Sequence, residues 1–338
     1  MKRKICVCMA FTVAVLLIVG VAGCGPGEQA ETESTENSSE TTAEQSETVS
    51  AGPKMPPVNV LIIACEGKEN SFPLNFFLIT VDNNTNEVRF TNFFYETQID
   101  AVTTEGEPVS IPMYKLTELC DMEGIIDAFE NMYGIAVDKY LIYRYDNNMI
   151  IDIFKHMCPI TVDIPEEYIG SGEGTLKKSM ERYSDSTGEE ITPVDAAGEQ
   201  ELGPLALLSY FHTIPEWVYA SEDDLTRKME DYKYWDAKNE YALSVYKPVF
   251  ELMGEQALTA LGQSIMEGQD TNITDDDIAA WAKRLTELPD GKTPYLTIPG
   301  FEDIGLEKFE GDPMGSTMML TYDKAEAAEK VQAFVNGE

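Results

Sequence analysis

Positively charged residues are scarce in this sequence. The chain has 24 lysines and arginines against 60 aspartates and glutamates, which gives a formal net charge of −36. Proteins that bind nucleic acid neutralise its phosphates with clusters of lysine and arginine, so nucleic acid is excluded as a partner. The same acidic surplus repels anionic lipid headgroups, and we therefore expect contact with a membrane only through an anchor.

Histidine and cysteine are also rare. The two histidines, His156 and His212, are too few for a histidine-rich metal site, and neither belongs to a metalloprotease or serine-hydrolase motif. Each is expected at the end of a helix, where a cationic ring suits the helix dipole. After residue 24, three cysteines remain, without metal-ligand spacing. Cys65, Cys120 and Cys158 are expected to be buried small hydrophobes, and a disulfide between two of them stays open.

Long apolar runs are absent after the first two dozen residues. The chain begins with basic residues and an apolar run from about Ile5 to Val21, which ends in Val21-Ala22-Gly23-Cys24. This pattern is typical of a signal peptide, and the tetrapeptide resembles a bacterial lipobox. We therefore expect a lipoprotein signal peptide at 1–23 and lipidation at Cys24, with a plain transmembrane anchor as the alternative. Either arrangement places the rest of the chain outside the cytoplasm, tethered to the membrane.

The next segment, 24–57, is poor in apolar residues. After Cys24 it contains seven glutamates and a single lysine. Such a segment cannot bury enough apolar surface to offset the entropy lost on ordering, so it is expected to be a disordered, self-repelling tether. A folded domain is expected at 58–338.

Apolar patterning after Pro57 predicts strands that alternate with helices. Proline and turn residues bound the expected strands, and 169–201 is expected to be a loop. The expected strands are 58–64, a hairpin at 75–94, 138–146, 160–165, 295–300 and 317–323. The expected helices are 115–135, 147–157, 202–214, 223–235, 238–254, 275–288 and 324–335. Gly134 is expected as a helix C-cap, and two helix starts carry capping-box patterns, Ser221 with Asp224 and Thr274 with Asp277. This succession predicts a single α/β domain.

Two polar loops resemble ligand-binding motifs without matching them. The stretch Gly170 to Thr175, GSGEGT, lacks the lysine of a phosphate-binding loop, contains Glu173 and precedes no expected helix, so a flexible turn is favoured. The stretch 270–281 alternates oxygen-bearing residues like a calcium loop. It has no central glycine, and Trp281 stands where a glutamate is required, so helix capping explains it better.

The order of elements resembles the LytR-CpsA-Psr family. Four segments carry the resemblance: VNVLIIACEGK, the hairpin with NFFYETQI after it, GIAVDKY with its flanking helices, and CPITVDIPEE. Further on, LLSYFHT, TNITDDDIAAWA and TIPG are similar to later family segments. The resemblance implies a three-layer α/β/α sandwich with a mixed central sheet. It also implies an apolar pocket for a polyprenyl chain, with a mouth of arginine and aspartate residues that binds pyrophosphate and a divalent cation.

The chain departs from the family at this mouth. Where the family has G-x-D-x-R, R-S-D-T and P-R-D-T, this sequence has 64–68 (ACEGK), 72–75 (FPLN) and 94–97 (FYET). His212 replaces a later arginine, and Trp235 and Lys238 fall near a further arginine pair. Lysine does not reproduce the bidentate fork of arginine, and aromatic residues carry no charge. The family member predicted here is therefore a degenerate one.

The resemblance assigns two sets of candidate residues. The candidate catalytic residues of an active form are Glu66, Lys68, Glu96, His212 and Lys238. Glu66 and Glu96 are also candidate ligands of Mg²⁺, a cofactor expected only if the protein is active. Phe72, Tyr95 and Trp235 are candidate contacts for a sugar or lipid, and ordinary packing is the alternative for each.

Three functional hypotheses follow. The first is a lipid-anchored envelope protein that binds a polyprenyl-phosphate lipid, a polyprenyl-linked glycan or another wall glycan, with weak or no catalysis. The second is an active transferase that moves glycopolymers from a polyprenyl-pyrophosphate carrier to peptidoglycan. The third is a solute-binding lipoprotein of a transporter, which would have two α/β lobes.

Overall fold

The computed structural model describes residues 56–67, 72–85, 87–221, 223–287, 293–302, 304–309 and 318–338. The expected signal peptide, the lipidation site Cys24, the tether up to residue 55, and Lys68 lie outside the described residues. None of the helices in the described ranges is long and apolar enough to cross a membrane.

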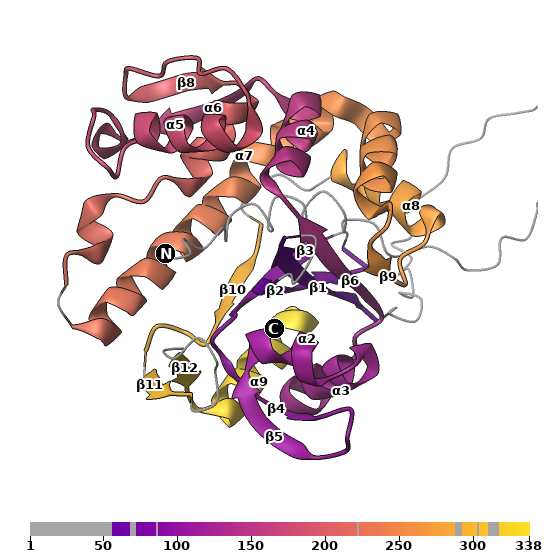
Figure 1. Ribbon diagram of the computed structural model, residues 1–338. Helices are drawn as coiled ribbons and strands as arrows, with labels where there is room; N and C mark the ends of the chain where they lie inside the picture. Colours follow the sequence, from indigo (N-terminus) through magenta and orange to yellow (C-terminus); the bar gives the residue numbers. More distant parts are fainter. Residues whose placement is uncertain are drawn as a thin grey trace, which may run out of the picture.

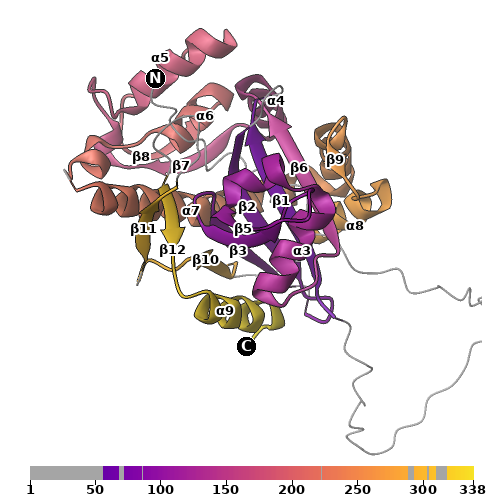
Figure 2. The same ribbon diagram turned by 60° about the horizontal axis from the view of Figure 1, so that its bottom comes forward.

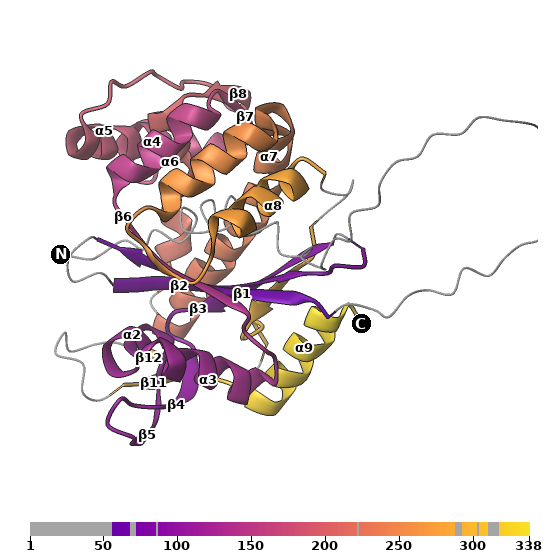
Figure 3. The same cartoon turned by 90° about the vertical axis from the view of Figure 1, so that its right-hand side faces the viewer.

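A mixed six-stranded sheet lies at the centre of the fold (Figures 1 and 3). Its strands are β1 (Val58–Glu66), β2 (Phe72–Val81), β3 (Val88–Phe94), β6 (Lys139–Tyr145), β9 (Asp270–Thr271) and β10 (Tyr295–Ile298), in the order β10-β3-β2-β1-β6-β9. β1 is antiparallel to β2 and parallel to β6, and β3 is antiparallel to β2 and parallel to β10. The apolar run of β1 is buried on both sides, since Val60 and Ile62 pack on one core and Leu61 and Ile63 on the other.

Helices cover both faces of this sheet, which makes three layers (Figure 3). One face carries α4 (Asn147–Met157), α5 (Leu176–Thr187), α6 (Pro204–His212), α7 (Asp224–Met266) and α8 (Asp275–Leu285). The other carries α2 (Leu116–Leu119), α3 (Met122–Tyr133) and α9 (Lys324–Asn336) (Figure 3), and α3 and α9 are also seen from below in Figure 2. Three two-stranded sheets are added: β4 (Gln98–Val102) with β5 (Pro108–Pro112), β7 (Ile160–Ile164) with β8 (Gly198–Leu202), and β11 (Gly305–Lys308) with β12 (Met318–Thr321). The predicted α/β/α architecture with a mixed sheet is confirmed.

Most of the predicted elements are present, and three need correction. The expected helix 115–135 is divided, because Asp121 accepts a hydrogen bond from the amide of Gly124 at 2.9 Å and caps a new helix there. The two helices expected at 223–235 and 238–254 form the single helix α7, which kinks at Gly254 and continues to Met266. The segment 169–201 is not a loop throughout, since it contains α5 and β8. Gly134 is a C-cap in the left-handed conformation, as predicted.

The N-cap patterns and the cysteines give a mixed result. α7 is capped by Asp223, which accepts from the amide of Thr226 at 2.7 Å, and not by Ser221. The capping box of Thr274 with Asp277 is confirmed at the start of α8. The described cysteines Cys65, Cys120 and Cys158 form no disulfide with one another; Cys65 and Cys120 are buried as expected, whereas Cys158 is half-buried.

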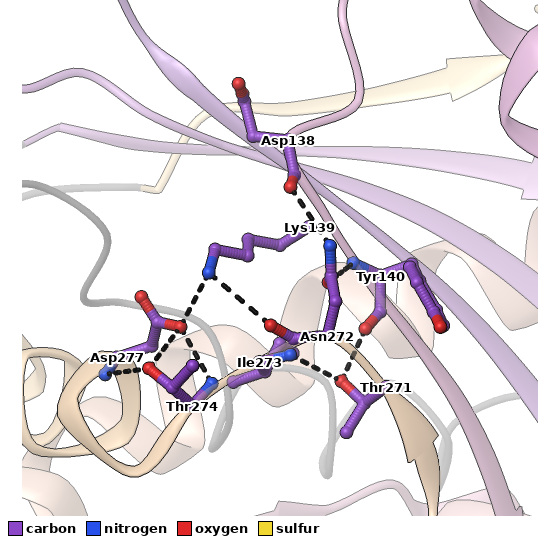
Figure 4. Close-up of polar contacts among 8 residues, drawn as sticks. All are labelled: Asp138, Lys139, Tyr140, Thr271, Asn272, Ile273, Thr274 and Asp277. Atoms are coloured by element: carbon purple, nitrogen blue, oxygen red, sulfur yellow. Dashed lines mark hydrogen bonds and ion pairs between the residues drawn. The ribbon is translucent and has the colours of Figure 1, made fainter.

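The polar stretch 270–277 connects α8 to β6 (Figure 4). The Nζ of Lys139 on β6 lies 2.8 Å from Asp277, which also accepts from the amide of Thr274 at 2.8 Å. The side chain of Asn272 accepts from the amide of Tyr140 at 2.8 Å, and that of Thr271 donates to the Tyr140 carbonyl at 2.5 Å. These contacts use the oxygens that resemble a calcium loop, so the stretch has a structural role.

Candidate functional site

Three of the segments that depart from the family meet at one end of the sheet. β1 ends where β2 begins, because Glu66 pairs with Phe72 across the ladder. β2 begins where β3 ends, because Asn75 pairs with Phe94. Tyr95 and Glu96 follow Phe94 directly, so Glu66, Phe72, Tyr95 and Glu96 share this end of the sheet.

The aromatic candidates at this end pack on one another. The Phe72 ring stacks on Tyr114 with centroids 5.2 Å apart and meets Tyr95 edge-on at 6.0 Å. Tyr95 is 6% exposed, and burial, aided by the charge of Glu96, raises the pKa of its hydroxyl well above the usual value. Phe72 is half-buried. A ligand can therefore contact the half-buried Phe72, whereas the buried Tyr95 packs against the Phe72 ring.

Glu96 is held by two residues from the first turns of α7. Its carboxylate is 2% exposed and accepts from the Nζ of Lys228 at 2.6 and 2.7 Å and from the hydroxyl of Tyr232. The Tyr232 ring stacks on Phe94 at 4.3 Å. Burial, with the charge of Glu96, raises the pKa of Tyr232, so the hydroxyl stays protonated and donates. Lys228 and Tyr232 were not predicted, because nothing local in the sequence shows that a helix 132 residues away reaches Glu96.

His212 lies away from Glu96, at the end of α6. Its Nδ1 lies 2.8 Å from the carbonyl oxygen of Leu208, which makes that nitrogen the donor, and its ring packs on Tyr183 at 4.8 Å. The side chain is 4% exposed, and burial lowers its pKa to about 3. The ring is therefore neutral near pH 7 and does not replace the positive charge of an arginine.

Lys238 is surrounded by three tyrosine rings, on the same side of the sheet as His212. Its Nζ lies 4.7, 4.9 and 5.2 Å from the ring centroids of Tyr168, Tyr210 and Tyr234. It donates to the carbonyl oxygens of Tyr210 and, at 3.0 Å, Thr213. These contacts satisfy carbonyls at the C-terminal end of α6, where a cation is favourable.

The candidates on α7 thus form a second group, separate from Glu96. Lys238 lies six residues after Tyr232, which is about 9 Å along a helix axis. Trp235 is 2% exposed and meets Tyr234 edge-on at 5.8 Å, so it belongs to the core. The candidate set is therefore divided between the end of the sheet and the contact of α6 with α7.

Asp236 is a further, half-buried carboxylate that the sequence did not single out. Its Oδ1 accepts from Asn92 on β3 at 3.2 Å and from Tyr295 and Thr297 on β10 at 2.8 and 2.5 Å. Burial raises its pKa, against the opposing effect of these hydrogen bonds. Asp236 therefore fixes α7 to the β3–β10 edge of the sheet through neutral donors.

The described residues contain no ready-made cluster of metal ligands. Within the described ranges no group of three or more histidine, cysteine, aspartate or glutamate side chains is placed to hold a metal ion. Glu66 is half-buried at the end of β1, and the Glu96 carboxylate is already bound by Lys228 and Tyr232.

No family model matches this sequence, and no curated protein does. Several solved structures have a similar fold, among them the following three. Streptococcus agalactiae gbs0355 has a TM-score of 0.55 at 12% identity, over 83% of this chain and 88% of that one. A candidate transcription regulator of Eubacterium siraeum has 0.52 at 14%, over 88% and 100%. Bacillus subtilis TagV, a LytR-CpsA-Psr protein, has 0.51 at 14%, over 83% and 98%. At these identities the likeness concerns the fold, and the chain therefore has a LytR-CpsA-Psr-like fold.

Proposed function

We propose that this chain is an extracytoplasmic envelope lipoprotein, anchored through Cys24, whose domain binds a polyprenyl-linked glycan or another envelope component with weak or no catalysis. One observation carries the proposal. At the end of the sheet where the family has its arginine and aspartate residues, the carboxylate of Glu96 is neutralised by Lys228 and accepts a hydrogen bond from Tyr232. In an active site these charges would face the substrate. Here Glu96 and Lys228 form an ion pair that holds α7 in place.

Transfer from a pyrophosphate carrier places demands that this arrangement meets poorly. The leaving pyrophosphate carries dispersed negative charge, which arginine forks and Mg²⁺ must stabilise. His212 is neutral, and Lys238 is directed at backbone carbonyls. Mg²⁺ would have to displace Lys228 from Glu96 before it could use that carboxylate. Binding without efficient transfer is the function these contacts favour.

Buried polar atoms beside the sheet support an internal ligand. Asn239 lies four residues after Trp235 on the buried face of α7 and is 0% exposed. Neither its amide nitrogen nor its amide oxygen has a hydrogen-bond partner among the described residues, and the same is true of the indole nitrogen of Trp235. An unmade buried hydrogen bond costs about 1–3 kcal/mol, which a bound molecule with polar groups would recover.

The test uses the full chain in lipid nanodiscs with a fluorescent polyprenyl phosphate. We expect saturable binding that weakens in Asn239→Leu, and no Mg²⁺-dependent phosphate release from the corresponding pyrophosphate. Absence of binding to polyprenyl phosphates and to wall glycans alike would reject the proposal.

The second candidate function is an active transferase. It is favoured by Lys228, whose side chain is 28% exposed and places a positive charge beside Glu96. Phosphate release that disappears in Glu96→Gln would support it. A solute-binding lipoprotein is less favoured, since six of the described strands join in one sheet and not in two lobes.

A further inference from the structure

Trp217 differs from the other tryptophans of the chain by its exposure. Trp235 and Trp281 are 2% and 1% exposed, whereas Trp217 is 53% exposed. It lies in the short 3-10 helix η3 (Glu216–Tyr219), between α6 and α7. Its apolar ring and indole N–H give Trp217 a large surface that could contact a ligand.

The exposed ring is held in place by the residues around it. Trp217 meets Tyr234 edge-on, with centroids 6.1 Å apart and planes at 82°. Tyr234 is itself fixed, because its hydroxyl donates to the Thr213 carbonyl at 2.6 Å and its ring faces the Nζ of Lys238 at 5.2 Å. A preformed ring loses little entropy when it binds a ligand.

The glycine loop 170–175 packs directly under η3. A Cβ on Gly174 would lie 2.9 Å from the amide nitrogen of Glu216 and 3.0 Å from the carbonyl oxygen of Ile214, so only glycine permits this approach. A Cβ on Gly172 would lie 3.8 Å from the Glu216 carboxylate, so that exposed carboxylate lies above the loop. The segment that carries the indole is thus seated on a backbone without bulky side chains, and the exposed carboxylate of Glu216, its neighbour in sequence, lies over the same loop.

We propose that Trp217 and Glu216 form a binding platform for a neutral or amino-bearing sugar of an envelope glycan. The inference rests on the proposed function and adds to it a ligand class and a site. The C–H face of a pyranose can pack on the indole, while its hydroxyl or amino groups donate to the Glu216 carboxylate. The chain's net charge of −36 opposes an anionic glycan.

A protein partner fits this surface less well. Protein interfaces have a contiguous apolar centre, and the other large exposed hydrophobic residues of the described chain lie on different elements or loops. They are Val102, Ile191 and Leu252. Val218, the apolar neighbour within η3, is 1% exposed and turned into the core.

The experiment titrates the full chain in detergent micelles with three oligosaccharides: chitotetraose, its deacetylated amine form, and an oligoguluronate as the anionic comparison. Binding is followed by saturation-transfer NMR. We expect binding of the first two, a loss of roughly tenfold or more in affinity for Trp217→Ala, and retention within about threefold for Trp217→Phe. Glu216→Gln should weaken the binding of the amine form more than the binding of chitotetraose. Leu252→Ala, an exposed apolar residue on α7, is the matched control and should change nothing.

The inference would be overturned by no binding of either sugar, by equal binding by Trp217→Ala with unchanged thermal unfolding, or by preference for the anionic chain. A shift of oligomeric state in Trp217→Ala by sedimentation, with sugar affinity unchanged, would make the ring a contact between copies and would also overturn it. Polyprenyl-phosphate binding is measured on the same variants. If the wild type binds polyprenyl phosphate but none of the sugars, the inference fails and the proposed function stands; if it binds neither polyprenyl phosphate nor any wall glycan, both fail.

Discussion

The pair formed by Lys228 and Glu96 is asymmetric in burial, because the lysine side chain is 28% exposed and the glutamate 3%. Lys228→Met leaves the buried Glu96 carboxylate without its cation, whereas Glu96→Gln leaves a lysine that can turn into water. Removing one partner of a buried pair costs about 3–5 kcal/mol, and we expect Lys228→Met to approach that range and Glu96→Gln to cost about 1–2 kcal/mol. Urea unfolding measures both.

The double variant Lys228→Met/Glu96→Gln should recover part of the loss. Lys233→Met removes an exposed lysine of the same helix, paired with Glu230, and should cost less than about 1 kcal/mol. Equal losses for Lys228→Met and Lys233→Met would show that the buried carboxylate does not depend on Lys228.

The raised pKa of Asp236 predicts that the stability of the protein depends on pH. Because burial raises its pKa in the folded state, the folded chain binds more protons than the unfolded chain above the ordinary value of 3.8. Its contribution to stability is therefore present below pH 3.8 and is lost as the pH rises through the folded pKa. In Asp236→Asn this dependence should vanish, and the stability of the variant relative to the wild type should rise between pH 4 and 7. A flat difference across that range would contradict the assignment.

At the scale of residues, the sequence predicted where the candidate side chains lie in the fold better than it predicted their burial, charge state and partners. The order of elements was sufficient to bring Phe72, Tyr95 and Glu96 to one end of the sheet. Charge state and partners were not predictable, because the pKa of His212 depends on burial and the partners of Glu96 come from a distant helix. The polar tip after β3 therefore was recognised as part of the site, but its neutralisation by α7 was not.

Among the elements, α8 depends on a single carboxylate. Asp277 accepts from both the amide and the hydroxyl of Thr274 and pairs with Lys139 on β6 (Figure 4). Asp277→Ala removes these contacts and should cost about 2–3 kcal/mol in urea unfolding. Asp276→Ala, in the same turn but exposed, should cost less than about 1 kcal/mol, since only the helix dipole is affected. Similar costs for the two variants would contradict the role of Asp277 in fixing the start of α8 to β6.

The glycine loop offers a second comparison between neighbouring positions. Gly174→Ala would bring a methyl group within 2.9–3.2 Å of the backbone of Ile214, Pro215 and Glu216, whereas at Gly172 the nearest atoms lie at 3.8 and 4.0 Å. Backbone cannot move aside as a flexible side chain can. We expect Gly174→Ala to destabilise by about 1–3 kcal/mol and Gly172→Ala by less than 1 kcal/mol, measured by thermal unfolding. A larger effect at Gly172 would contradict this packing.

Elements with strong periodicity were predicted, and those fixed by tertiary contacts were missed. β1 and the β2–β3 hairpin follow from continuous apolar runs and a turn. The sequence pattern does not predict α5, because its buried stripe, Leu176, Met180 and Tyr183, is narrow and surrounded by polar residues. β8 was missed for a related reason, since Gly198–Leu202 has little strand propensity and is defined by pairing with β7.

For the whole molecule, the net charge of −36 predicts a dependence of stability on salt. Folding concentrates like charges that lie further apart in the unfolded chain, so their repulsion opposes the compact state. Salt shortens the range of this repulsion from about 30 Å at 0.01 M to about 8 Å at 0.15 M, whereas the buried pair of Glu96 with Lys228 is screened much less.

Raising NaCl from 0.01 to 0.15 M should therefore increase the free energy of unfolding by about 1 kcal/mol or more, seen as an upward shift of the melting temperature of a few degrees. Equal osmolality of glycerol is the control for solvent effects without charge. A melting temperature that falls with salt would mean that exposed ion pairs such as Lys324 with Asp100 contribute more than the overall repulsion. Because the acidic surplus far exceeds the number of available partners, we expect the repulsion to dominate.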